Sequence, residues 1–124
     1  MNNDLSVRIS VASPEADLSA VVWPGVSTIY YPGTESADQI QAADAHIGRL
    51  EMLRGIRPGT ITLVPVIESP LGITMAHEIA SSSPRIQVVG VGPHLEALYY
   101  ARSECELVAR ALGLNVLDIQ YIFD

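Results

Sequence analysis

The chain has 124 residues, enough for one domain with its own core, and 48% of them are hydrophobic. Its net charge of −7, with only seven basic residues, excludes the basic surface that non-specific nucleic-acid binding requires. All of these basic residues are arginines, so Schiff-base aldol chemistry, a pyridoxal-phosphate lysine and a Walker-type phosphate loop are excluded as well.

The sequence suggests neither a secretory signal nor a membrane span. Its first ten residues contain no basic start and no apolar secretory core, and the apolar runs are interrupted by proline, glycine or charge. The single cysteine, Cys105, can form neither an internal disulfide nor a thiolate metal cage. We therefore expect a cytoplasmic protein that does not contact a membrane.

Strands and helices are expected to alternate along the whole chain. In chain order, we expect a strand at 5–10, a helix at 14–22, a strand at 26–31, a helix between the cap at 36 and the stop at 55, a strand at 60–68, a short helix at 74–80, a strand at 86–91, a helix at 95–112 and a strand at 114–123. This alternation predicts parallel strands with right-handed crossovers, and we expect cover on both faces of the sheet.

Helical spacing is clearest after Ser36, which forms a capping-box pattern with Gln39. The residues expected on its apolar face are Ile40, Ala43, Ile47, Leu50 and Leu53. In the helix at 95–112, the leucines expected to point inward are Leu95, Leu98, Leu107 and Leu112. Pro65 is awkward inside a central strand, because proline has no N–H for the ladder.

Two architectures fit this pattern of elements. One is an open doubly wound sandwich, and the other is a segment of a (β/α) barrel. A complete barrel needs roughly 200 residues or more, so this chain cannot close one alone.

In both architectures, functional residues follow the carboxyl ends of the strands. Glu68 ends the strand at 60–68, where its carboxylate can bind Mg²⁺ or accept hydrogen bonds from the start of a helix. Arg8 can bind a substrate carboxylate or pair internally with Glu35 or Glu68. Glu35 can simply precede the cap at Ser36. His94 follows a strand and can serve as a base or ligand, or only begin a helix.

The most distinctive segments are VPVIESPLGI followed by HEIASSSPRIQVVGVG, and LYYARSECELVARALGLNVLDIQY. Together they resemble the HpcH/HpaI aldolase and citrate lyase β-subunit-like family, and SVRIS resembles that family's Arg-Val-Asn strand. The similarity covers nearly the whole chain. It implies an α/β fold in which residues 1–124 form a single truncated (β/α) TIM-type barrel domain of about five βα units with parallel strands.

The resemblance implies a lyase that uses Mg²⁺ to cleave or form carbon–carbon bonds in oxo-acid or acyl-CoA substrates. It implies that Arg8 is the catalytic and substrate-binding residue and that Glu68 is a metal ligand. An arginine and a divalent ion both stabilise the negative charge of an enolate, and this chemistry needs no lysine nucleophile.

The chain departs from the family pattern at several places. The family's second metal-binding aspartate is missing, since no acid lies between Gly90 and Leu95; His94 stands nearby, although histidine prefers softer metals than Mg²⁺. The family's strand-end lysine is Gly33, and the asparagine after its strand arginine is Ser10. The family's first two strands and its last strand have no counterpart here.

These features support two functional hypotheses. The first is a Mg²⁺-dependent carbon–carbon lyase, and the second is a non-catalytic remnant or accessory subunit of such a lyase. An unclosed parallel sheet exposes edge strands. We therefore expect a homo-oligomer, or a partner chain that completes the barrel.

Overall fold

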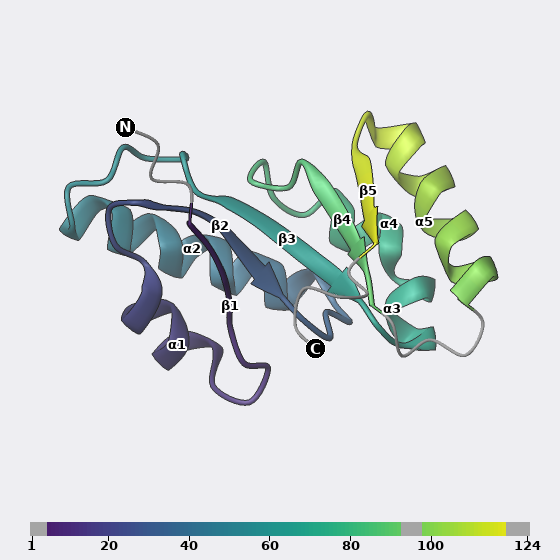
Figure 1. The fold of residues 1–124 in the computed structure, drawn as a ribbon, viewed down its shortest axis with the longest axis horizontal. Helices are drawn as coiled ribbons and strands as arrows, with labels where there is room; N and C mark the ends of the chain where they lie inside the picture. The colour runs from purple at the N-terminus through teal and green to yellow at the C-terminus, as the bar shows by residue number, and fades with distance from the viewer. Residues whose placement is uncertain (1–4, 93–97, 119–124) are drawn as a thin grey trace.

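Five parallel strands lie side by side in the order in which they occur along the chain (Figure 1). The computed structural model describes residues 5–92 and 98–118. Its strands are β1 (Leu5–Arg8), β2 (Val26–Tyr31), β3 (Thr62–Ile67), β4 (Val88–Val91) and β5 (Asn115–Asp118). A doubly wound sheet reverses its strand order at a switch point, whereas a barrel continues in one direction. The sheet is therefore a barrel segment.

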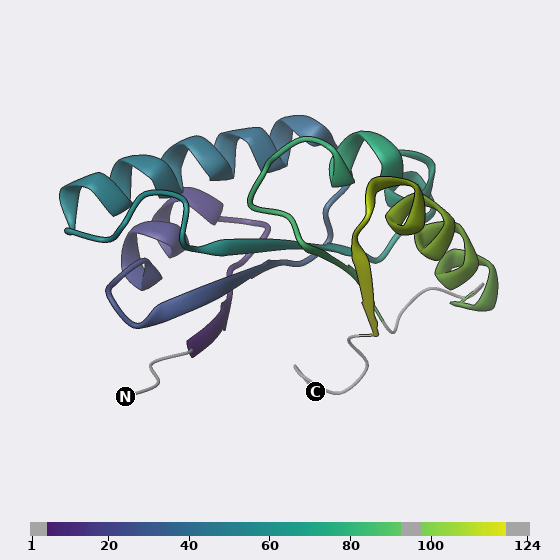
Figure 2. The same cartoon turned by 90° about the horizontal axis from the view of Figure 1, so that it is seen from above.

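The helices all lie on one side of this sheet, as Figure 2 shows. They are α1 (Pro14–Val21), α2 (Ala37–Leu53), α3 (Pro70–Thr74), α4 (Ala76–Ala80) and α5 (Leu98–Leu112). Among the described residues, the opposite face carries no helix, although its residues Tyr30, Val64 and Val66 are buried. Crossovers of one hand between successive strands of a sequential sheet place every helix on the same side.

Side chains that alternate along the strands divide the core into two clusters. Ile29, Leu63 and Val89 belong to the large cluster that also contains the buried residues of the helices. The intervening residues Tyr30, Val64 and Val66 form a smaller buried cluster on the opposite face. In a barrel, this opposite face is the interior.

Pro65 does lie in the central strand β3, where the sequence analysis found it awkward. The β2–β3 pairing ends at Tyr31 opposite Pro65, and the β3–β4 pairing begins one residue later, at Val66 opposite Gly90. Proline is therefore tolerated because it stands where one ladder ends and the other begins.

The helix after Ser36 is confirmed, including its capping box: the Ser36 hydroxyl accepts from the Gln39 N–H, and the Gln39 side chain accepts from the Ser36 N–H. Leu53 was expected in the core but is 79% exposed, because it is the last residue of α2. Leu107 of α5 was expected to point inward and is 64% exposed, whereas Cys105 and Ala109 are buried. The prediction is therefore wrong at Leu107, whereas Leu112 packs against the core as expected, and the side chains of Leu95 and Leu98 lie outside what the structure describes.

The remaining elements agree with the expectations apart from their bounds. The short helix at 74–80 is found as two, α3 and α4, and the last strand ends at 118 within the described range. Among the residues that the structure describes, no helix is both long and apolar enough to cross a bilayer.

Candidate functional site at the carboxyl edge of the sheet

Arg8 and Glu68 both lie at the carboxyl edge of the sheet. Arg8 is the last residue of β1, and Glu68 directly follows the last residue of β3. Strand β2 runs between them, since β1 and β3 each pair with it. Arg8 is in register with Tyr30, so its side chain leaves the sheet on the face of the smaller cluster, opposite the helices.

The Glu68 side chain lies between the loops that follow β2 and β4. A Cβ added to Gly92 would fall on this side chain, 2.8 Å from its Oε1 atom, and one added to Gly33 would lie 3.9 Å from Oε2. The Gly92 N–H donates to the Ile67 carbonyl at 2.8 Å, which holds the second loop against β3. Gly92 thus provides the room that this side chain occupies, whereas a Cβ at position 33 would make only an ordinary contact with it.

The carboxylate of Glu68 is half-buried and has no hydrogen-bond or ion-pair partner within residues 5–92 and 98–118. The helix-capping role that the sequence left open for it is filled by Ser69. The Ser69 hydroxyl accepts from the Gly72 N–H at 3.0 Å and is the N-cap of α3. The oxygens of Glu68 therefore remain available to a ligand from outside the described chain.

Glu35, in the loop after β2, has a structural partner. The Ser69 hydroxyl donates to its Oε2 atom at 2.7 Å, and its own N–H donates to the Gln39 side chain at 2.7 Å. Glu35 therefore joins the loop after β2 to the start of α3. It precedes the cap at Ser36, as the simpler interpretation of the sequence predicted.

Arg8 lines a cavity of about 440 Å³ together with Ile9, Ser10, Asp17 and Pro32. The Ser10 N–H donates to the Asp17 carboxylate at 2.6 Å, so the loop after β1 is held by α1. Glu68 does not belong to the lining of this cavity. The structure thus brings Arg8 and Glu68 to one edge but does not place them in one pocket.

The donor set at this edge fits a hard cation held mainly through water. Glu68 offers one carboxylate, the ligand type that Mg²⁺ prefers, and Mg²⁺ keeps several of its waters in protein sites. Across the described ranges, no three His, Cys, Asp or Glu side chains are grouped to hold a metal. His94, the possible replacement ligand, lies outside the described residues.

A serine–histidine contact elsewhere on the molecule does not form a nucleophile. The His46 Nε2 atom lies 2.9 Å from the Ser19 hydroxyl, and its Nδ1 atom lies 3.0 Å from an Arg49 nitrogen. Arginine can only donate, so Nδ1 is the acceptor and Nε2 carries the proton. His46 therefore donates to Ser19 and cannot remove its proton.

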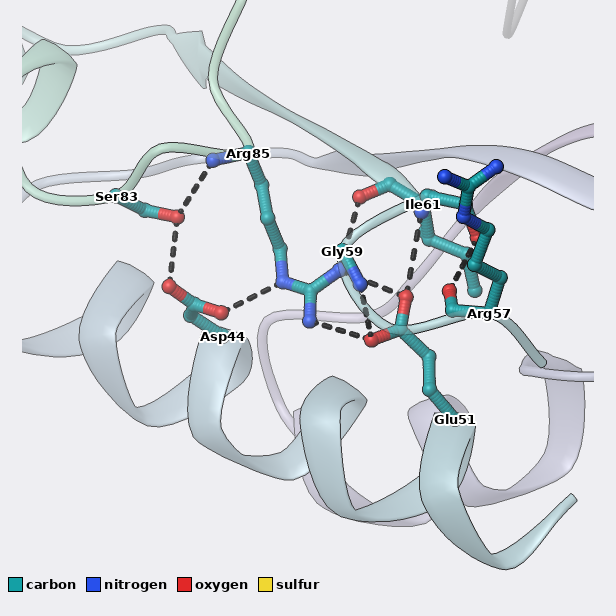
Figure 3. Close-up of polar contacts among 8 residues, drawn as sticks. Asp44, Glu51, Arg57, Gly59, Ile61, Ser83 and Arg85 are labelled. Carbon is teal, nitrogen blue, oxygen red and sulfur yellow. Dashed lines mark hydrogen bonds and ion pairs between the residues drawn. The ribbon is translucent and has the colours of Figure 1, made fainter. Parts of the chain in front are cut away.

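A buried ion-pair network lies at the other end of the sheet, and sequence reasoning missed it. Arg85 precedes β4, and its guanidinium lies between Asp44 and Glu51 of α2 at 2.6 and 2.7 Å (Figure 3). Glu51 is fully buried and also accepts from the N–H groups of Gly59 and Ile61. A glutamate among the apolar residues of α2 was the one available signal.

This network ties the amino ends of β3 and β4 to α2. Burial alone would raise the pKa of Glu51, but the hydrogen bonds from Arg85, Gly59 and Ile61 outweigh it and hold the pKa below its usual value. In (β/α) barrels the amino-terminal face serves stability rather than catalysis. We assign the network to the fold.

The sequential parallel sheet and its one-sided helices define this chain as part of a (β/α)-barrel protein. The family model of the HpcH/HpaI aldolase/citrate lyase family matches residues 2–123. The chain belongs to this family, as the sequence resemblance predicted.

Curated relatives support the assignment. The chain is 34% identical to the citrate lyase subunit beta of Escherichia coli strain K12 in an alignment 131 residues long. The alignment covers 93% of this chain and 43% of that protein. The chain is 36% identical over 67 residues to the L-malyl-CoA/beta-methylmalyl-CoA lyase of Rhodobacter capsulatus, covering 54% of this chain and 21% of that protein. The chain thus spans less than half the length of these relatives.

The fold is similar to that of a solved structure. Malate synthase of Haloferax volcanii, in a pyruvate/acetyl-CoA ternary complex, aligns with a TM-score of 0.78 over 95% of this chain and 40% of that one. The sequence identity is 15%, so this likeness supports the fold alone.

Proposed function

We propose that this chain is the Mg²⁺-binding part of a lyase that cleaves or forms a carbon–carbon bond in an oxo-acid or acyl-CoA substrate. The observation that carries the proposal is the half-buried Glu68 carboxylate without a described partner, at the edge where (β/α) barrels have their sites. The named activities of the relatives are of the same class, since they are citrate lyase and malyl-CoA lyase proteins.

In this proposal Glu68 holds the metal ion and Arg8 binds the substrate. The Arg8 guanidinium donates two parallel hydrogen bonds to a substrate carboxylate and orients it above the sheet. When bound, Mg²⁺ supplies stabilisation of the negative charge on an enolate oxygen. The close approach of Gly92 limits the positions open to the Glu68 side chain, which would preorganise the metal site.

The proposal includes a second chain, either another copy or a different subunit. Strand β1 pairs only with β2 and β5 only with β4 within the described sheet, so both outer strands are edges. Leu5 on β1 is 59% exposed. Exposed edge strands tend to pair with other chains, and such pairing would add the strands that a barrel needs.

Calorimetric titration tests the metal site. We expect Mg²⁺ and Mn²⁺ to bind weakly alone and more tightly with an oxo-acid such as pyruvate, because a single protein carboxylate holds Mg²⁺ poorly without substrate oxygens. Glu68→Gln should abolish this heat, and the control Glu106→Gln, on the exposed surface of α5, should not. An absence of heat in every combination would remove the metal-enzyme proposal.

One observation favours the alternative of a non-catalytic remnant or accessory subunit. The described part of the chain contains no group of three possible metal ligands. A chain of this kind would bind a lyase partner but show no activity in an acyl-CoA lyase assay, with or without Mg²⁺. The same assay on Glu68→Gln separates the two functions, since only an active parent can lose activity.

Sedimentation measures the proposed association. We expect the sedimentation coefficient to increase with protein concentration, or a complex to form with a lyase partner. A well-folded monomer at high concentration that also binds no partner would contradict the proposal.

A further inference from the structure

A second pocket lies on the helix side of the sheet and shares no lining residue with the cavity at Arg8. It has a volume of about 310 Å³ and lies between α1 and α2, above the end of β2. Its floor is formed by buried residues, including Leu18, Tyr31 and Ala43. This volume is within the range of pockets that hold small molecules, and an apolar floor is typical of them.

The floor carries one polar group that the fold does not use. Tyr31 is 3% exposed, and its hydroxyl has no hydrogen-bond partner among the residues described. Burial raises the pKa of this hydroxyl above its usual value of 10.0, so it stays protonated and can donate as well as accept. Buried hydroxyls without a partner are costly, and native proteins rarely leave them so.

The charges at the mouth have one sign. Glu15 and Asp38 line the pocket and are exposed, whereas neither Arg nor Lys is part of the lining. His46 also lines it, but its two ring nitrogens already contact Ser19 and Arg49. The mouth therefore attracts cations and repels anions.

We propose that this pocket binds a small amine whose ammonium group meets Glu15 and Asp38 at the mouth and whose opposite end offers a hydrogen-bonding atom to Tyr31. An apolar body between the two ends packs on Leu18 and Ala43. The charge of this ligand is opposite to that of the oxo-acid and acyl-CoA substrates proposed above. The pocket is thus a separate site, and the proposal does not rest on the lyase function.

Titration with three small molecules tests this site. Binding is measured by NMR, from the chemical shifts of the amide groups of Leu18 and Ala43. Tyramine has both the ammonium group and a hydroxyl, phenethylamine lacks the hydroxyl, and para-hydroxyphenylpropionate replaces the ammonium group by a carboxylate. We expect tyramine to saturate the shifts and phenethylamine to bind about fivefold to tenfold more weakly, since it lacks one hydrogen bond. The propionate should not bind.

Variants assign the contacts. Tyr31→Phe should lower the affinity for tyramine by about the same factor and leave the affinity for phenethylamine unchanged, because only tyramine uses the Tyr31 hydroxyl. Glu15→Gln with Asp38→Asn should remove the preference for amines, while Glu106→Gln should change nothing. Tyr31→Phe should also unfold at the same temperature as the parent or higher, since the hydroxyl lacks a partner.

Four results would each overturn the proposal. One is that no probe gives saturable shifts, which would mean that water alone fills the pocket. Another is an equal effect of Tyr31→Phe on the two amines. A third is binding of the propionate as tight as that of tyramine. The last is a lower unfolding temperature for Tyr31→Phe, which would show that the hydroxyl already has a partner in the fold.

Discussion

The side chain of Glu68 lies directly against the backbone of Gly92, so that a Cβ at position 92 would overlap with it. The two residues follow neighbouring strands, β3 and β4, and the Gly92 N–H holds the loops together through the Ile67 carbonyl. The position of the candidate metal ligand therefore depends on a glycine one strand away.

Gly92→Ala should move the Glu68 carboxylate and lower the Mg²⁺ affinity by about tenfold to a hundredfold, the range seen when a group that orients a metal ligand is lost. Calorimetry measures the effect. Gly48→Ala is the matched control, because a Cβ there makes only an ordinary contact, at 3.7 Å from Arg85, and replaces a glycine inside α2. If Gly92→Ala leaves the metal affinity unchanged, Glu68 does not bind the metal.

Arg85→Met should destabilise the fold by about 3–5 kcal/mol, because it leaves the buried Glu51 without its charged partner. Urea unfolding measures this free energy. The control Glu106→Gln removes an exposed pair with Arg102 within α5 and should cost about 0.5 kcal/mol or less. Similar values for the two variants would show that the buried network contributes little.

Acid should weaken the fold through Glu51. Its pKa is lower in the folded chain than its usual value of 4.5, so its contribution to stability is complete above that value and is lost as the pH falls through the folded pKa. Urea unfolding between neutral pH and about pH 3 should show this loss. Glu51→Gln should flatten the profile at the acid end, and a profile parallel to that of the parent would refute the assignment.

Cys105 should be unreactive in the folded chain. Burial, together with the nearby charge of Glu104, raises the pKa of its thiol to about 11, from a usual value of 9.0. At about pH 8 its thiolate population is then about a hundredfold below that of an exposed cysteine. A chromogenic disulfide reagent should label it slowly in the folded chain and fully in urea. Rapid labelling without urea would contradict its burial.

Local patterns were sufficient for the elements that depend on neighbouring residues. Ser36 and Gln39 predicted the start of α2, because a capping box involves only one turn of the chain. The inward face of α5 was predicted wrongly at Leu107, because the packing of that helix on β4 and β5 decides which side is buried. Pro65 in β3 could not be understood without knowing where each ladder ends.

The sequence by itself determined the alternation of strands and helices, the family, and the positions of Arg8 and Glu68 at strand ends, since these depend on periodicity, motifs and order along the chain. Only the tertiary structure decided which carboxylate has a partner, because Glu35 and Glu68 both precede helices in the sequence yet only Glu35 is bound by Ser69. It also decided the burial of the Arg85–Glu51 pair and of the Tyr31 hydroxyl. Partners and burial come from segments far apart in the chain, which no local pattern records.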